Sequence, residues 1–130
     1  MRAPAGARLL QHADGKLPDV RSRVCSAACA RFELAIPETL AWFIGHFPDH
    51  PVLPGVAQVG WAVHFSRETF GLAADPPRIE RVKYQRPIRP GETVYLVLSR
   101  DAERPARIAW RFERAGRILG SGRLEFAPES

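Results

Sequence analysis

Apolar residues recur at helical spacing in one stretch of the chain, from residue 55 to about residue 70. Val56, Val59 and Val63 follow this spacing, which is typical of an amphipathic helix. Gly71 directly follows the stretch, and glycine is common where a helix ends because it readily takes the left-handed conformation. The pattern therefore predicts one long helix over residues 55–70.

Beyond this helix, apolar and polar residues alternate with a period of two, which is typical of strands with one buried face. The alternation is clear over residues 81–84, 107–112 and 123–126. Turn-forming residues at 90–91, 101–105 and 115–116 divide this part of the chain into four strands in an antiparallel run.

Upstream of the helix, the sequence predicts an arm, a strand and a short turn of helix. Residues 1–18 are rich in Ala, Gly and Pro without clear periodicity, which predicts a loosely ordered arm. Residues 24–36 predict a first strand that ends at Pro37, and residues 37–43 can form one helical turn. For a chain of 130 residues, these elements predict a single α+β domain whose helix packs on an antiparallel sheet.

The charge of the chain is positive, with 19 Lys and Arg against 14 Asp and Glu. Basic residues are scattered from Arg2 to Arg123, which argues against a nucleic-acid-binding stripe. A positive surface favours acidic partners, although it can also serve solubility alone. Residues 1–8 lack the apolar core of a signal peptide, and no apolar run approaches the roughly 20 residues that span a bilayer. We therefore expect a cytoplasmic protein that does not enter a membrane.

Cysteines and histidines offer no clear metal site. Cys25 and Cys29 lie within the predicted first strand, too far apart to pair along an extended chain, so we expect small buried side chains. His46 and His50 have a spacing that brings two imidazoles together only on a helix, and Pro48 lies between them. No further ligand is evident near them, so we expect no metal.

The most informative segment is residues 45–62, Gly-His-Phe-Pro-Asp-His-Pro-Val-Leu-Pro-Gly-Val-Ala-Gln-Val-Gly-Trp-Ala. Its three prolines before the helix hold His46 on a stiff, extended loop. The first backbone N–H groups of the helix that follows have no partner within it, so they can stabilise a developing oxyanion. A base and an oxyanion site are thus predicted close together in sequence.

This segment resembles the active-site signature of hot-dog-fold 3-hydroxyacyl-[acyl-carrier-protein] dehydratases, His-Phe-Pro-x-x-Pro-Val-x-Pro-Gly-Val. The continuation Gly-Val-Ala-Gln-x-x-Trp-Ala is similar to a subgroup tied to aryl polyene and related pigment pathways. A weaker resemblance runs from about residue 31 to residue 126 and includes Arg-Val-Lys-Tyr-Gln-Arg-Pro-Ile-Arg-Pro-Gly at 81–91. It implies a hot-dog fold, in which an antiparallel sheet wraps one long central helix, and the removal of water from a 3-hydroxyacyl thioester.

The resemblance also implies roles for individual residues. His46 becomes the base that removes the C2 proton, a task that suits the pKa of histidine. Pro54, Gly55 and Val56 form the substrate-binding start of the helix, where the Gly55 N–H donates to the thioester oxygen. The structural alternative for His46 is a hydrogen-bonded loop histidine. Trp61 can line an acyl tunnel, although a buried aromatic residue is more often core.

One departure from the family concerns the general acid. The family has Asp or Glu fourteen residues after the histidine, and this chain has Gly60 there. His64 lies one helical turn later and shares a face with Gly60, so it can supply the proton as an imidazolium. An ordered water is a second candidate for the donor. The third alternative is that the chain no longer dehydrates its substrate. Gly60 can also serve close packing, and His64 can be structural.

The resemblance implies partners as well. Acyl carrier proteins are acidic, and Arg81 and Lys83 share a strand face on which a carrier can dock. The substrate brings its own phosphopantetheine, so no other cofactor is expected. The family builds its sites at or near the interface of a homodimer. Two other functions stay open: a non-catalytic subunit that binds acyl chains or dimerises, and a thioesterase.

Overall fold

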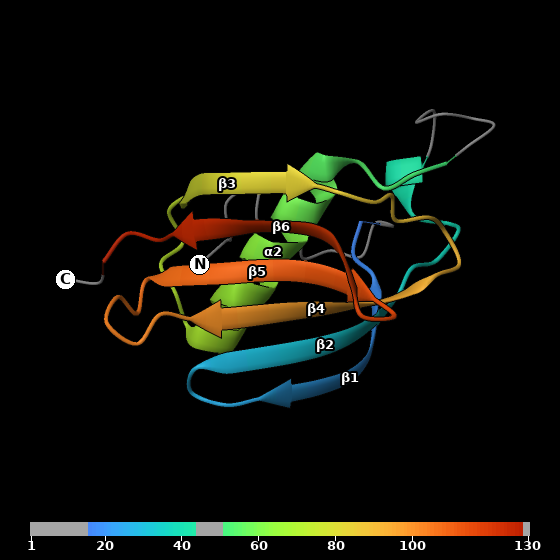
Figure 1. The fold of residues 1–130 in the computed structure, drawn as a ribbon. Helices are drawn as coiled ribbons and strands as arrows, with labels where there is room; N and C mark the ends of the chain where they lie inside the picture. The colour runs from blue at the N-terminus through green and yellow to red at the C-terminus, as the bar shows by residue number, and fades with distance from the viewer. Residues whose placement is uncertain (1–15, 44–50, 129–130) are drawn as a thin grey trace, which may run out of the picture.

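One antiparallel sheet and one long helix make up the fold in a computed structural model that describes residues 16–43 and 51–128 (Figure 1). In chain order the elements are β1 (Asp19–Cys25), β2 (Cys29–Ala35), the short 3-10 helix η1 (Ala41–Phe43), α2 (Gly55–Phe70), β3 (Arg78–Tyr84), β4 (Thr93–Arg100), β5 (Arg107–Arg114) and β6 (Arg117–Glu125). The strand order in the sheet is β1-β2-β4-β5-β6-β3, so β1 and β3 form its two edges.

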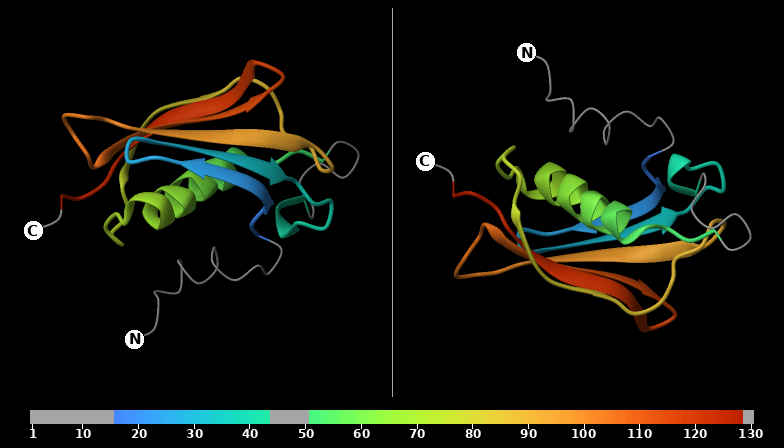
Figure 2. Two further views of the ribbon diagram at one scale, coloured as in Figure 1. Left: turned by 90° about the horizontal axis from the view of Figure 1, so that it is seen from below. Right: turned by 90° about the horizontal axis from the view of Figure 1, so that it is seen from above.

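The sheet curves around α2, which lies on its concave face (Figure 2). Strand residues that face the helix are buried: Phe32, Leu34, Leu96, Leu98, Ile108, Trp110, Phe112 and Leu124. They meet Ala57, Trp61, Ala62 and Phe65 from the helix. The predicted α+β class, with one long helix wrapped by an antiparallel sheet, is confirmed, because the alternation on the strands supplies one continuous apolar face.

The predicted helix over residues 55–70 is confirmed as α2. Pro54 is its N-cap in an extended conformation, with φ −61° and ψ 149°. Gly71 ends it in the left-handed conformation at φ 63°, and its N–H donates to the carbonyl oxygen of Arg67 at 2.9 Å.

The predicted single strand over residues 24–36 is wrong, because the chain reverses between β1 and β2. Ser26 closes this turn: its N–H donates to the Cys29 carbonyl oxygen at 2.7 Å, and its Oγ accepts from the Cys29 N–H at 3.1 Å. The turn has no Gly, Pro, Asn or Asp, and Ser26 alone is a weaker turn signal, so the apolar content suggested one continuous strand. Cys25 and Cys29 therefore flank a hairpin turn and are exposed, not buried as predicted.

The segment before β1 contacts the core through its backbone. The Lys16 carbonyl oxygen accepts hydrogen bonds from the indole N–H groups of Trp42, at 2.7 Å, and Trp61, at 2.8 Å. Leu17 packs against the core, and Pro18 is buried. The rest of the predicted arm, residues 1–15, lies outside the described residues.

Candidate functional site

A groove of about 320 Å³ opens at the start of α2. The end of β3 lies beside this helix start (Figure 1). Its lining residues are Val52, Leu53, Pro54, Gly55, Gln58, Tyr84, Gln85, Arg86 and Pro87. Other hollows in the described structure have similar or larger volumes. This groove differs from them because five of its lining residues, Val52, Leu53, Pro54, Gly55 and Gln58, belong to the sequence motif of residues 45–62.

The backbone fixes the approach to the helix. Leu53 donates its N–H to the Ile88 carbonyl oxygen at 2.7 Å, which ties the extended segment to the chain that follows β3. The Pro54 carbonyl oxygen accepts the N–H of Ala57 at 3.0 Å, which closes the first helical turn. The N–H groups of Gly55 and Val56 precede this first bond, so they have no acceptor within the helix and can bind a ligand oxygen.

Two polar side chains in the groove lie against glycines. The Tyr84 ring covers Gly55 so closely that a Cβ at Gly55 would fall 2.7 Å from the tyrosine hydroxyl oxygen. The amide of Gln58 lies against Gly120 of β6, where an added Cβ would overlap Oε1. Gln58 is only 3% exposed, and its Oε1 has no hydrogen-bond partner. The sequence alone predicted no role for either side chain.

The proposed base lies outside the described residues, as does His50. His64, the proposed donor, is described and does not line the groove. Its Nε2 pairs with Glu68 Oε2 at 3.4 Å, and its ring meets Phe65 edge-on. Burial lowers the pKa of His64, an effect that Glu68 opposes and Arg67 and Arg23 reinforce. The lowered pKa favours the neutral imidazole at pH 7.

The two other predicted helix residues differ in their surroundings. Gly60 is half-buried, whereas Trp61 is fully buried and packs edge-on against Phe112 of β5. Its indole N–H, the one polar group of the side chain, donates to the Lys16 carbonyl oxygen. Trp61 therefore has the surroundings of a core residue. The described residues that line the groove include no Asp or Glu. Among the described residues, the structure therefore places no side-chain carboxylate in the lining at the start of α2.

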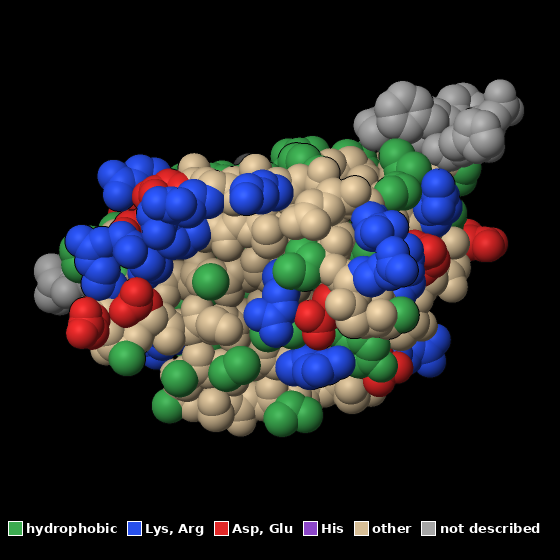
Figure 3. All heavy atoms as spheres, in the orientation of Figure 1, with side chains coloured by type: hydrophobic (Ala, Val, Ile, Leu, Met, Phe, Trp, Pro, Cys, Tyr) green, Lys and Arg blue, Asp and Glu red, His purple; other side chains and the backbone are tan. Residues whose placement is uncertain are grey.

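Arg81 and Lys83 line a hollow of about 450 Å³ on the face of the sheet opposite to α2. A bulge in β3 separates them, since the pairing with β6 shifts between Glu80 and Lys83 and Arg81 has φ 57°. Figure 3 shows this face, where Lys and Arg side chains gather in several groups. The structure adds Arg86, which lines the groove itself and which the sequence analysis missed.

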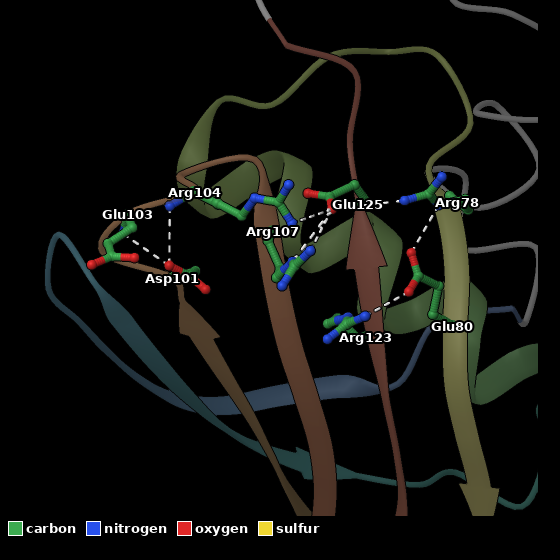
Figure 4. A network of polar contacts seen from close by, with 8 residues as sticks. All are labelled: Arg78, Glu80, Asp101, Glu103, Arg104, Arg107, Arg123 and Glu125. Carbon is green, nitrogen blue, oxygen red and sulfur yellow. Dashed lines mark hydrogen bonds and ion pairs between the residues drawn. The ribbon is translucent and has the colours of Figure 1, made fainter.

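Other charged side chains near the start of β3 pair with one another in an ion-pair network (Figure 4). Glu80 accepts from Arg123 at 2.6 Å and from Arg78 at 2.8 Å, and these hydrogen bonds lower the pKa of Glu80 to about 2. On β6, Glu125 pairs with Arg107 at 3.0 Å. Arg81 and Lys83 form no ion pair with any residue in the described ranges, so their charges remain available to a partner.

Neither a metal site nor a membrane span is found in the described part of the chain. Residues 16–43 and 51–128 contain no group of three or more His, Cys, Asp or Glu placed to hold a metal ion. Across the same ranges, no helix has both the length and the apolar character needed to cross a bilayer.

Known dehydratases match this chain in both sequence and structure. The ApeI-like family, described as ApeI dehydratase, matches residues 22–123. The solved dehydratase heterocomplex ApeI:P from Xenorhabdus doucetiae contains a chain that superposes with a TM-score of 0.78 at 31% identity, covering 85% of this chain and 98% of that one. The dehydratase domain of PpsC from Mycobacterium tuberculosis, at 20% identity and a TM-score of 0.68, shares the fold over 85% of this chain and 44% of that one.

Curated relatives are also dehydratases, and they match the chain at lower coverage. The 3-hydroxyacyl-[acyl-carrier-protein] dehydratase FabZ of Bordetella pertussis is 33% identical over 96 residues, which cover 64% of this chain and 61% of the relative. The FabZ of Herpetosiphon aurantiacus is 35% identical over 66% of this chain and 67% of its own length. The chain thus spans about three fifths of the first of these relatives. By the extent of its match, the chain belongs to the ApeI-like family of hot-dog-fold dehydratases.

Proposed function

We propose that this chain removes water from a 3-hydroxyacyl thioester on an acyl carrier protein, giving the 2-enoyl thioester in a cytoplasmic polyene or fatty-acid-like pathway. The observation that carries the proposal is the groove at the start of α2, into which the family motif leads. Family membership supports the same reaction.

The chemistry follows from the acidity of C2. A thioester carbonyl makes the C2 proton weakly acidic, and a donor that stabilises the developing oxyanion makes it easier to remove. The Gly55 N–H supplies that donor at the helix start, and His46 takes the proton. The C3–O bond then breaks as the double bond forms. The substrate carries phosphopantetheine, and the elimination uses no further cofactor.

Recognition of the carrier is assigned to basic side chains near the groove. Arg86 lies in its lining, and Arg81 and Lys83 of β3 line the hollow on the sheet face opposite to α2. A negatively charged carrier is attracted to these side chains, which raises its rate of association.

The assembly we propose is a homodimer with its sites at or near the subunit interface. β3 is an edge strand, and such an edge offers unpaired backbone groups to another chain. Ile79 of β3 and Val56 of α2 are 49% and 68% exposed, which leaves apolar surface beside that edge. Light scattering that finds a monomer at micromolar concentration would count against this assembly.

A second function has its own support. Gly60 replaces the family's carboxylate, and the similar solved chain from Xenorhabdus doucetiae belongs to a dehydratase heterocomplex. The chain can therefore be a subunit that binds the acyl group while another hot-dog chain supplies the acid.

Mass spectrometry of carrier-bound 3-hydroxyacyl thioesters incubated with the purified chain separates these functions. We expect loss of water, and we expect His46→Ala to abolish it while circular dichroism stays unchanged. No conversion by the chain alone, with conversion after addition of a second hot-dog subunit, would favour the binding subunit. Release of free acid would instead indicate a thioesterase.

A further inference from the structure

Tyr84 places a hydroxyl group at the first residue of α2. Its ring lies over Gly55, with the hydroxyl oxygen 2.7 Å from the position that a Cβ there would occupy. The residue is 53% exposed, and its hydroxyl forms no hydrogen bond with another described residue. A ligand in the groove can therefore reach this hydroxyl.

Gln58 provides a second, independent group in the same groove. Its Oε1 is buried without a donor, whereas buried carbonyl oxygens are almost always hydrogen-bonded. That oxygen lies where Gly120 would carry a Cβ, and Gly120 is the residue of β6 that pairs with Tyr84. Side chains at directly paired positions are neighbours on one face of a sheet. The Gln58 oxygen and the Tyr84 side chain therefore lie side by side.

The pair suits a substrate hydroxyl, which both donates and accepts a hydrogen bond. Gln58 Oε1 can accept from it, and the Tyr84 hydroxyl can donate to it. Among the described residues of the lining, only Tyr84 and Arg86 have side chains that carry an ionisable proton, and arginine does not release its proton in proteins. Burial raises the pKa of Tyr84, so its phenol keeps its proton at neutral pH.

We propose that Tyr84 donates the proton to the departing 3-hydroxyl group, in place of the carboxylate that Gly60 replaces, and that Gln58 orients this hydroxyl. This role rests on the dehydration proposed above. The C2–H bond breaks and its proton goes to His46. The electron pair forms the C2–C3 double bond, and the C3–O bond breaks. The leaving oxygen takes the proton of Tyr84 and departs as water, after which the tyrosinate regains a proton from His46 through solvent. Atoms and electrons balance without an oxidant or reductant.

Tyr84→Phe tests the role because it removes the hydroxyl and keeps the ring over Gly55. We expect turnover to fall by at least about 10²-fold, the lower end of what a positioned acid supplies, at an unchanged melting temperature. Tyr95→Phe is the matched control. Tyr95 lies on β4 against Arg31, on the other face of the sheet, so its hydroxyl is remote from the groove.

A binding measurement separates contact with the substrate from a structural role. Isothermal titration calorimetry would compare the amide analogue of a 3-hydroxyacyl pantetheine with the analogue that lacks the 3-hydroxyl. The parent should prefer the hydroxylated compound, and Tyr84→Phe and Gln58→Leu should each lose at least part of that preference. Equal preference in the parent and Tyr84→Phe would overturn the proposal.

The kinetic outcomes are distinct. A parent that dehydrates and a Tyr84→Phe variant that keeps more than a tenth of its turnover would overturn the role of Tyr84 and leave the proposed function standing. A parent that converts no 3-hydroxyacyl thioester would overturn the proposed function, and the proton-donor role with it. An active parent, a Tyr84→Phe variant with at least a 10²-fold loss and an unaffected Tyr95→Phe control would support both.

Discussion

Gly120→Ala is a sharp test of the groove's architecture, because Gly120 is where β6 meets the amide of Gln58. An added methyl group would overlap Gln58 Oε1 and lie 3.2 Å from its Cδ. Gln58 is almost fully buried, so its amide cannot simply swing into solvent. Forcing a methyl into a packed interior typically costs about 1–3 kcal/mol. Replacing glycine by alanine in a strand returns about 0.5–1 kcal/mol.

The net expectation, from the difference of those two terms, is a loss of up to about 2.5 kcal/mol in the free energy of unfolding. For a domain of this size the melting temperature should fall by up to about 10 °C. Thermal unfolding followed by circular dichroism measures the change, with all variants at one protein concentration because assembly shifts the apparent stability.

A double-mutant cycle assigns the cost to Gln58. In a Gln58→Ala background the methyl group has free space, so Gly120→Ala should be neutral or stabilising there, which gives a coupling of about 1–3 kcal/mol. Gly122→Ala is the matched control, since its methyl would come within 2.7 Å of Trp110 instead. Its cost should be the same in both backgrounds. An equal cost of Gly120→Ala with and without Gln58 would refute the packing described here.

Three further outcomes are expected. Gly60→Asp should raise dehydration by up to about 10²- to 10⁴-fold if it restores the family's acid, and His64→Ala should matter less in that background than in the parent if His64 is the present donor. An unaffected His64→Ala parent would remove His64 as donor. Because burial lowers the pKa of His64, the unfolded chain binds its proton more readily. Stability should therefore fall as the pH drops below about 6.5, and His64→Gln should flatten that slope; an unchanged slope would contradict this. Reversing the charges of Arg81 and Lys83 should weaken turnover of carrier-bound substrate more than turnover of small thioesters, and equal effects would exclude carrier docking there.

The sequence alone determined the elements that have a strong period. The valine spacing and Gly71 predicted α2 within its observed bounds, and the alternation after residue 80 predicted strands with one apolar face. These predictions hold because a helix and a half-buried strand each impose a fixed period on the chain that must bury one side. The motif of residues 45–62 also predicted the helix start at Gly55, since prolines followed by a glycine define a helix start locally.

The local sequence pattern did not predict the hairpin between β1 and β2. Ser26 makes that turn through its own side chain, without a Gly, Pro, Asn or Asp beside it. The exposure of Cys25 and Cys29 followed from the same turn, so the prediction of buried cysteines failed with it.

Only the tertiary structure decided which side chains share the groove. Tyr84 and Gly120 meet because β3 pairs with β6, although the two strands are far apart in sequence. Gln58 joins them because the helix face that carries it packs on those strands. Glycines two apart, at 120 and 122, hinted in the sequence at a close approach within a strand, but not at what approaches. Periodicity records which side of an element is buried, whereas contact between distant elements depends on strand order and register, which no single element encodes.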